Sequence, residues 1–444
     1  MYKKTFHGGA HPQGGKQLAR DIPFRTWLPK QDLVFHLNQH IGKPAKPVVQ
    51  KGDAVLAGQV IAEADGFVSA NVVCSCSGRV KAVEKRRNVL GTTDLSIVVE
   101  NDGQYTLADG IGEETDYTAL SGKEILDRIK AAGIVGLGGA GFPTHVKLAP
   151  KKPEEIRYVI ANGAECEPYI CCDDQLMRTF PEEIVGGMKV MLSLFPAAEG
   201  VILIEENKPE AIAAMERACS GEPNIRVHRV KAKYPQGSER SVMSVVAGKH
   251  IRLGMLPADV GCVVDNVATV RAVYRTVCKS EPLMERGFTV SGDGVETPCN
   301  LMVKIGTCFE EMLEAAGGFK GGEEPEKLLC GGPMMGFAMA DLEAAVCKNN
   351  NALTVLRKDP VAEAHRQMTS CLRCGRCNQA CPLGLTPQMM SVAAQRGDYE
   401  RYEKKLYGLE CVACGTCTFV CPAKRPLMQL FKQTKAEIMA AKRK

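Results

Sequence analysis

Eight cysteines near the C-terminus fall into two runs with the same spacing. The runs read CLRCGRCNQACP and CVACGTCTFVCP, and their cysteines are Cys371, Cys374, Cys377 and Cys381, then Cys411, Cys414, Cys417 and Cys421. In the pattern C-x-x-C-x-x-C-x-x-x-C-P, three thiolates on a tight loop reach three corners of one iron–sulfur cube, and the fourth ligates another cube. The spacing therefore predicts two [4Fe–4S] clusters, which store and relay single electrons.

Each predicted cluster takes ligands from both runs. One cluster combines Cys371, Cys374 and Cys377 with Cys421, and the other combines Cys411, Cys414 and Cys417 with Cys381. Gly375 and Gly415 leave room for backbone N–H groups to approach the cluster sulfides. Zinc in a closed tetrahedral site is the alternative, but zinc needs only four thiolates, and the doubled run argues against it.

A glycine-rich loop, GIVGLGGAGFPTHVK at residues 133–147, is the second motif that suggests a binding site. It contains G-x-G-x-x-G from Gly136 to Gly141, but the dinucleotide fingerprint also requires a strand directly before it. Residues 121–132 instead have apolar residues at helical spacing and begin with a serine–glutamate capping box. The ordinary dinucleotide assignment therefore fails. A loop rich in N–H groups, with the cation of Lys147 close behind it, still suits a phosphate or a flat ring.

Polar side chains follow the predicted strands after this loop. A strand at residues 156–161 ends in a loop that carries Asn162, Glu165, Glu167 and Asp173. Acids at the carboxyl end of a strand suit ribose hydroxyls or ring nitrogens, and a solvated acidic loop is the alternative. Later strands alternate with helices, and the loops between them carry Tyr234, Gly237 and Asn266. The alternation predicts an α/β domain whose loops meet on one edge.

The composition limits where such chemistry takes place. The chain has 444 residues and a formal net charge of +5, which gives no case for nucleic acid as a partner. The sequence contains neither a run of about 18 apolar residues nor an N-terminal apolar signal core. We therefore expect a cytosolic protein, or one held at a membrane only through partners. In such a chain, twenty cysteines indicate metal rather than disulfides, and those outside the two runs are expected to be small buried hydrophobes.

The motifs together resemble a known family. GLGGAGFPTHVK, NGAECEP, KYPQGSE and DNVAT occur in this order, as in the flavin- and NADH-binding fold of the flavoprotein subunit of respiratory complex I. With the two cysteine runs and LLCGGPMMG, the chain is more similar to the C subunit of the Rnf complex, the ion-pumping ferredoxin:NAD oxidoreductase. The resemblance covers essentially the whole chain. It implies FMN over the glycine loop, with NAD(H) against the exposed face of the flavin.

The resemblance also implies roles for individual residues, although it singles out no catalytic residue. The implied FMN contacts are Gly136, Gly138, Gly139, Lys147, Asn162, Asp173, Tyr234, Gly237 and Asn266. The implied nucleotide contacts are Phe142, Glu165 and Glu167. A carboxylate on the ribose would repel a 2′-phosphate, which favours NAD over NADP. Complex I commonly has arginine where this chain has Leu137, so a charge near the flavin phosphate is absent, and FMN is expected to bind more weakly or in a different arrangement.

The expected fold is a multidomain α/β structure of four parts. They are a lipoyl-like barrel-sandwich β domain at residues 1–115, a Rossmann-like α/β FMN/NADH domain at 116–284, a β-grasp (SLBB-like) domain at 285–345 and a helical two-cluster ferredoxin domain at 360–444. The first domain has no lysine between Gln59 and Arg79 that could carry a swinging lipoyl arm. We therefore expect it to have a structural or docking role.

The resemblance implies that hydride moves between NAD(H) and the flavin, which exchanges single electrons with the two clusters. It also implies partners: the other subunits of a membrane Rnf-type complex, and ferredoxin directly or through one of them. The chain would then be peripheral, on the cytoplasmic side of the cell membrane. A soluble cobalamin (corrinoid) reductase with the same cofactors is one alternative. A cluster-carrying relay subunit without flavin is another, and it predicts neither flavin nor nucleotide binding.

Overall fold

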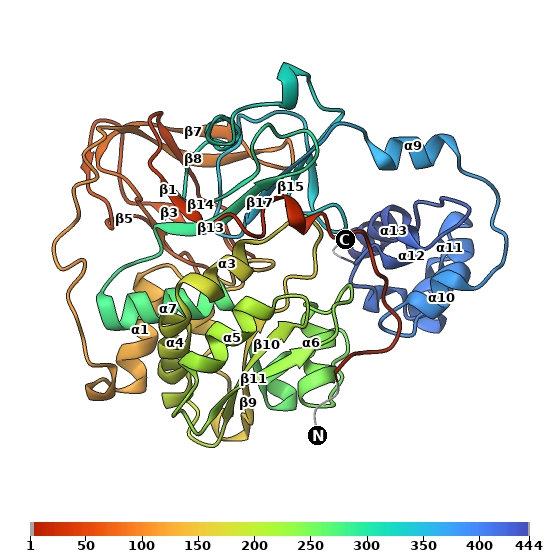
Figure 1. Ribbon diagram of the computed structural model, residues 1–444, viewed down its shortest axis with the longest axis horizontal. Coiled ribbons are helices and arrows are strands. Elements are labelled where there is room, and N and C mark those ends of the chain that lie inside the picture. The colour runs from red at the N-terminus through yellow and green to blue at the C-terminus, as the bar shows by residue number, and fades with distance from the viewer. Residues whose placement is uncertain (1–3, 443–444) are drawn as a thin grey trace.

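Four β-sheets organise the computed structural model, which describes residues 4–442 (Figure 1). The chain passes from an N-terminal β domain through a helix-covered parallel sheet and a mixed sheet to a helical lobe at the C-terminus (Figure 1). The predicted multidomain α/β fold, with its four parts in this order, is confirmed. We call residues 370–442 the cluster lobe.

The parallel sheet has the strand order β11-β10-β9-β12. Its strands are β9 (Tyr158–Gly163), β10 (Glu199–Glu205), β11 (Ile225–Val230) and β12 (Cys262–Asn266). The helices are α1 (Gly122–Ala131), α2 (Thr144–Lys147), α3 (Cys172–Thr179), α4 (Pro181–Ser193), α5 (Pro209–Ala218), α6 (Glu239–Val246) and α7 (Val267–Lys279). Because alternate residues of a strand face opposite sides, Val159 and Ala161 pack with α4 and α7, whereas Ile160 packs with α6. Burial on both faces explains the continuous apolar runs of these strands.

A crevice is expected where the order of the parallel strands reverses. Strand β9 pairs with β10 on one side and with β12 on the other. In open parallel sheets, ligands bind at the carboxyl ends of strands at such a point. The glycine loop reaches this edge from α1, and the predicted capping box is present, since Ser121 Oγ accepts from Glu124 N at 3.3 Å. The helix predicted before the loop is therefore confirmed.

The N-terminal β domain consists of two small antiparallel sheets around one core. Their orders are β2-β8-β7-β4 and β3-β5-β6. The strands are β2 (Leu33–His36), β3 (Lys46–Pro47), β4 (Ala54–Val55), β5 (Val60–Glu63), β6 (Val72–Val73), β7 (Gly78–Arg87) and β8 (Thr93–Asn101). Leu33, Ile61 and Ile97 are fully buried between the sheets, and Cys74 and Cys76 pack beside them as small hydrophobes.

The mixed sheet joins residues from opposite ends of the chain. Its order is β1-β14-β13-β17-β15-β16, with α8 (Phe309–Ala315) packed on it. The strands are β1 (Phe24–Trp27), β13 (Glu285–Ser291), β14 (Cys299–Lys304), β15 (Lys327–Cys330), β16 (Phe337–Met339) and β17 (Ala352–Leu356). Strand β1 runs parallel to β14, with Phe24 opposite Asn300. Strands β1 and β17 both lie outside the 285–345 range expected for the β-grasp domain, and the four predicted domain limits stay a prediction.

The cluster lobe is a small helical unit with its own core. Its helices are α10 (Arg376–Ala380), α11 (Pro387–Gln395), α12 (Thr416–Phe419) and α13 (Leu427–Ala441), with a π-helical turn at Arg401–Lys405. Met390, Leu427 and Phe431 are buried between them. Helix α9 (Pro360–Arg366) links β17 to the lobe and has no buried residue (Figure 1). Within residues 4–442, no helix combines the length and the apolar character needed to cross a membrane.

Candidate functional site

A cavity of about 560 Å³ lies at the carboxyl ends of β9 and β12. Its wall is formed by the glycine loop, the acidic loop after β9, the turn at Tyr234, the start of α7 and two residues of the cluster lobe. All the residues implied for FMN and NAD(H) line it: Gly136, Gly138, Gly139, Phe142, Lys147, Asn162, Glu165, Glu167, Asp173, Tyr234, Gly237 and Asn266. The structure therefore gathers a set of residues that the sequence scatters over several loops. Their separate roles stay a prediction.

The floor of the cavity is a hydrogen-bonded frame around Asn266. This residue caps α7, because its Oδ1 accepts from Ala268 N at 2.8 Å, and its Nδ2 donates to Asp173 Oδ2 at 2.7 Å. Gly138 lies directly against it, and a Cβ on Gly138 would come within 2.8 Å of the Asn266 side chain. A glycine is therefore required here for close approach of the loop.

The predicted cation is held in the cavity wall. Lys147 Nζ donates to Val264 O at 2.7 Å and to Asp265 Oδ1 at 3.0 Å. Burial favours the neutral amine, but the nearby carboxylates of Asp265 and Glu239 outweigh it and raise the pKa of Lys147. Burial in turn raises the pKa of Asp265, and its Oδ2 has no partner among the described residues.

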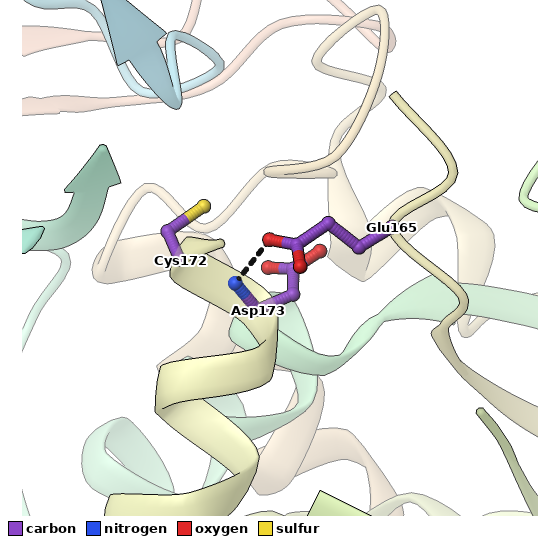
Figure 2. A group of neighbouring side chains, drawn as sticks. All are labelled: Glu165, Cys172 and Asp173. Atoms are coloured by element: carbon purple, nitrogen blue, oxygen red, sulfur yellow. Dashed lines mark hydrogen bonds between the residues drawn. The ribbon is translucent and has the colours of Figure 1, made fainter. Parts of the chain in front are cut away.

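Glu165 lies at the N-terminus of α3 beside Cys172 and Asp173 (Figure 2). Its Oε1 accepts from Asp173 N at 2.7 Å, and Lys16 Nζ lies 3.7 Å from its other oxygen. Burial raises the pKa of Glu165 to about 7, although Lys16 opposes the shift. The three side chains in Figure 2 offer ligand atoms within 4.8 Å of one another. Because the Glu165 carboxylate already contacts an N–H group and an ammonium, the arrangement favours a hydrogen-bonding acid over a metal ligand.

Glu167 is held by the LLCGGPMMG segment. Its carboxylate accepts from Met334 N at 3.1 Å and from Met335 N at 2.8 Å. A side chain on Gly332 would overlap this carboxylate, so the segment needs glycine there. Burial is the largest influence on Glu167 and raises its pKa to about 7, against these two hydrogen bonds.

This raised pKa leads to a pH-dependent prediction for Glu167→Gln. The folded chain keeps the Glu167 proton up to about pH 7, whereas the unfolded chain releases it near the ordinary pKa of 4.5. Stability contributed by this proton is therefore lost as pH rises through that window in the wild type, while glutamine does not titrate. When the pH is raised from about 5.5 to about 8, the wild type should lose about 2 kcal/mol of free energy of unfolding that the variant does not lose.

Urea unfolding at both pH values, followed by circular dichroism, measures this difference. Glu210→Gln is the control, because Glu210 is exposed on α5 and its replacement should leave the wild-type pH dependence unchanged. A Glu167→Gln effect of equal size at the two pH values would contradict the raised pKa.

The eight predicted cluster ligands surround two small cavities. Cys381, Cys411, Cys414 and Cys417 line one, and Cys371, Cys374, Cys377 and Cys421 line the other. Each set thus combines three cysteines of one run with one of the other, as the spacing predicts. Gly375 and Gly415, with φ of 75° and 79°, begin the helices that carry the third cysteines. The clusters themselves stay a prediction.

The two cysteine sets differ in their surroundings. Cys414 also lines the large cavity, and Tyr234 Oη donates to its carbonyl at 2.7 Å. Burial raises the pKa of Tyr234, which keeps the phenol protonated as a donor. In contrast, Cys371 and Cys374 are exposed. One set therefore adjoins the large cavity, and the other reaches the surface.

Three residues of the site were not found from the sequence. Asp265 directly precedes the predicted Asn266, but the sequence does not show that it is buried and paired with Lys147. Cys166 lines the cavity between the two glutamates and accepts from Gly237 N at 3.4 Å, but a single cysteine has no diagnostic spacing. Lys16 comes from a distant part of the chain, and no local pattern relates it to Glu165.

Three family descriptions match this chain. The RnfC barrel sandwich hybrid domain matches residues 4–104, the Nuo51 FMN-binding domain matches residues 129–275, and the SLBB domain matches residues 288–338. The second of these matches contains the glycine loop and the two residues of the cavity floor, Asp173 and Asn266.

Two relatives match this chain over nearly their whole length. The chain is 41% identical to the C subunit of a proton-translocating ferredoxin:NAD(+) oxidoreductase complex from Clostridium ljungdahlii, over 99% of this chain and 95% of that protein. It is 36% identical to the C subunit of the Na(+)-translocating complex from Acetobacterium woodii, over 99% and 98% of the two chains. Among solved structures, an H2-reduced NAD+-reducing [NiFe]-hydrogenase matches with a TM-score of 0.51 and 21% identity, over 73% of this chain and 63% of that one. This last similarity concerns the fold alone.

Proposed function

Because the chain belongs to the family of C subunits of Rnf-type ion-translocating oxidoreductase complexes, we propose that it is the FMN- and NAD(H)-binding iron–sulfur subunit of a ferredoxin:NAD(+) oxidoreductase. Its partners are the other subunits of that complex. One observation carries the proposal: a single cavity extends from the glycine loop to Cys414, so a flavin site and a predicted cluster ligand share one wall.

The residues of the cavity fit FMN. Bound FMN supplies the exchange between a two-electron hydride donor and single-electron carriers. The glycine loop allows a flat ring to lie close to the backbone, since a Cβ on Gly139 would meet nothing within 4 Å. Lys147 keeps a positive charge in the wall, where it pairs with Asp265. Glu165 and Glu167, with Phe142, are proposed to hold the ribose and ring of NAD(H).

The cysteine sets fit two [4Fe–4S] clusters, which supply one-electron relay when bound. Four thiols around each small cavity provide the required ligands. The buried set beside Tyr234 would hold the cluster next to the flavin, and the exposed set would hold the cluster that faces ferredoxin or a neighbouring protein of the complex. We also propose that the chain lies on the cytoplasmic side of the membrane and is held there by its partners.

An anaerobic NADH titration of the FMN- and iron-loaded chain tests this function. We expect the flavin absorbance to bleach and reduced-cluster EPR signals to appear. Bleaching without cluster signals would place the cluster potentials below that of NADH. In that case reduced ferredoxin replaces NADH as the electron donor in the test. If the fully iron-loaded chain does not bleach, the relay function without flavin replaces this proposal.

A further inference from the structure

The first described residues of the chain, 4–16, lie between the parallel-sheet domain and the cluster lobe. Figure 1 shows this segment in dark red, running between α6 and the blue helices. We call it the N-terminal strap. It contacts the cluster lobe, the turn at Tyr234 and the acidic loop, which are three separate parts of the proposed site.

At the cluster lobe, the strap contacts a predicted cluster ligand. Gly9 N donates to Ala380 O at 2.8 Å, and a Cβ on Gly8 would lie 2.7 Å from Cys381 O. Gly8 also has φ of 73°, a conformation that favours glycine. Only a residue without a side chain can follow this path, because the atoms it would meet belong to the backbone.

Next to the cavity, the strap forms a short backbone pair with Tyr234. Ala10 N donates to Tyr234 O at 2.8 Å, and Tyr234 N donates to Ala10 O at 2.9 Å. Phe6 is buried in the same core as α6, and Lys231 N donates to Lys4 O at 2.9 Å. Tyr234 also bonds the Cys414 carbonyl through its hydroxyl. We call the predicted cluster at Cys381, Cys411, Cys414 and Cys417 the inner cluster, and the other one the outer cluster. Tyr234 therefore contacts both segments that provide ligands for the inner cluster. It bonds the Cys414 segment directly and is joined to the Cys381 segment through the strap.

The far end of the strap is anchored at the acidic loop. Tyr169 N donates to Gly14 O at 2.6 Å, and Lys16 Nζ donates to Ile170 O beside Glu165. Lys16 remains charged in this buried position, because Glu165 raises its pKa although burial opposes this. The covalent link to the cluster lobe through α9 has no buried residue. The lobe also contacts the parallel-sheet domain through Glu410, which pairs with Arg240 at 2.8 Å.

We propose that the N-terminal strap is a positioning element that fixes the inner cluster-binding segments, at Cys381 and Cys414, against the flavin cavity. The inference rests on the proposed function and assigns the strap a role in the transfer step between the cavity and the cluster. It assigns no role in hydride transfer. The rate of electron transfer falls steeply with distance, so a loosened strap should slow that step selectively.

Gly8→Ala tests the proposal, with Gly14→Ala as the matched control on the same strap. A Cβ on Gly14 would meet only Lys16 N, at 3.9 Å. In the FMN- and iron-loaded Gly8→Ala chain, hydrogen exchange should increase at the Gly9, Ala10 and Tyr234 amides. Flavin bleaching by NADH should keep its wild-type rate, while cluster reduction becomes several-fold slower, because the loosened cluster segments move away from the flavin cavity. Gly14→Ala should match wild type in all three measurements.

Several outcomes overturn the inference. One is faster exchange at these amides with an unchanged rate of cluster reduction, and another is unchanged exchange in Gly8→Ala. If Gly8→Ala fails to retain iron, Gly9→Ala repeats the test, because its Cβ meets Tyr234 O at 2.7 Å and not a cluster ligand. A wild-type chain that does not bleach with NADH refutes the proposed function, whereas a bleaching wild type with an unaffected Gly8→Ala refutes only the strap.

Discussion

Replacing Cys414 with serine is expected to lower the iron content from about eight to about four atoms per chain. The remaining set, with Cys371, Cys374 and Cys377, contains no residue that the substitution touches. Flavin bleaching by NADH should persist, because the cavity keeps its glycine loop and both glutamates. Reduction of the outer cluster, which this remaining set is proposed to hold, should be largely lost with NADH as donor, since the inner cluster that connects it to the cavity is missing.

Iron analysis and rapid-mixing spectroscopy on the same preparation measure both effects. Cys278→Ser is the matched control, because Cys278 and Cys414 are both 8% exposed and Cys278 belongs to neither set. The control should keep its iron and its rate of cluster reduction. Fast reduction of the outer cluster in Cys414→Ser would contradict the proposed electron path through the buried cysteine set.

Gly138→Val should weaken FMN binding by about 100-fold, which corresponds to about 2.7 kcal/mol. The first added carbon would lie 2.8 Å from Asn266, which caps α7 and bonds Asp173. Either the loop moves into the cavity or Asn266 leaves its position, and both changes disturb the floor on which the flavin is proposed to lie. Iron content should remain unchanged, because the cysteine sets are in the cluster lobe.

Fluorescence titration of the iron-loaded variant with FMN measures this loss. Gly122→Ala is the control: it lies in the first turn of α1, where alanine is favoured, and its Cβ would meet only a flexible end of Leu194 at 3.3 Å. Gly122→Ala should bind FMN as wild type does. If Gly138→Val binds FMN with wild-type affinity, the glycine loop is not part of the flavin site and the proposal is contradicted.

The parts of the site that could be predicted from sequence are those encoded locally. The cysteine grouping follows from spacing within each run, and the helix before the glycine loop follows from the capping box that begins at Ser121. Contacts between distant residues left no such signal. Lys16 meets Glu165, and strand β1 pairs with β14, through tertiary packing that neither partner's neighbourhood encodes. Asp265 lies between these cases, since its motif was found but its buried pairing with Lys147 was not.

The pairing of the N-terminal strap with Ala380 joins residues that lie far apart in the sequence. During synthesis, the strap is made well before its partner on the cluster lobe. Contacts so distant in sequence form late in folding, because the intervening chain must be ordered first. The part of the strap at Gly8 and Gly9 therefore lacks its contact with Ala380 until the lobe has folded. Resistance to cleavage at Gly8 and Gly9 would then mark those molecules in a preparation in which the lobe has folded against the strap.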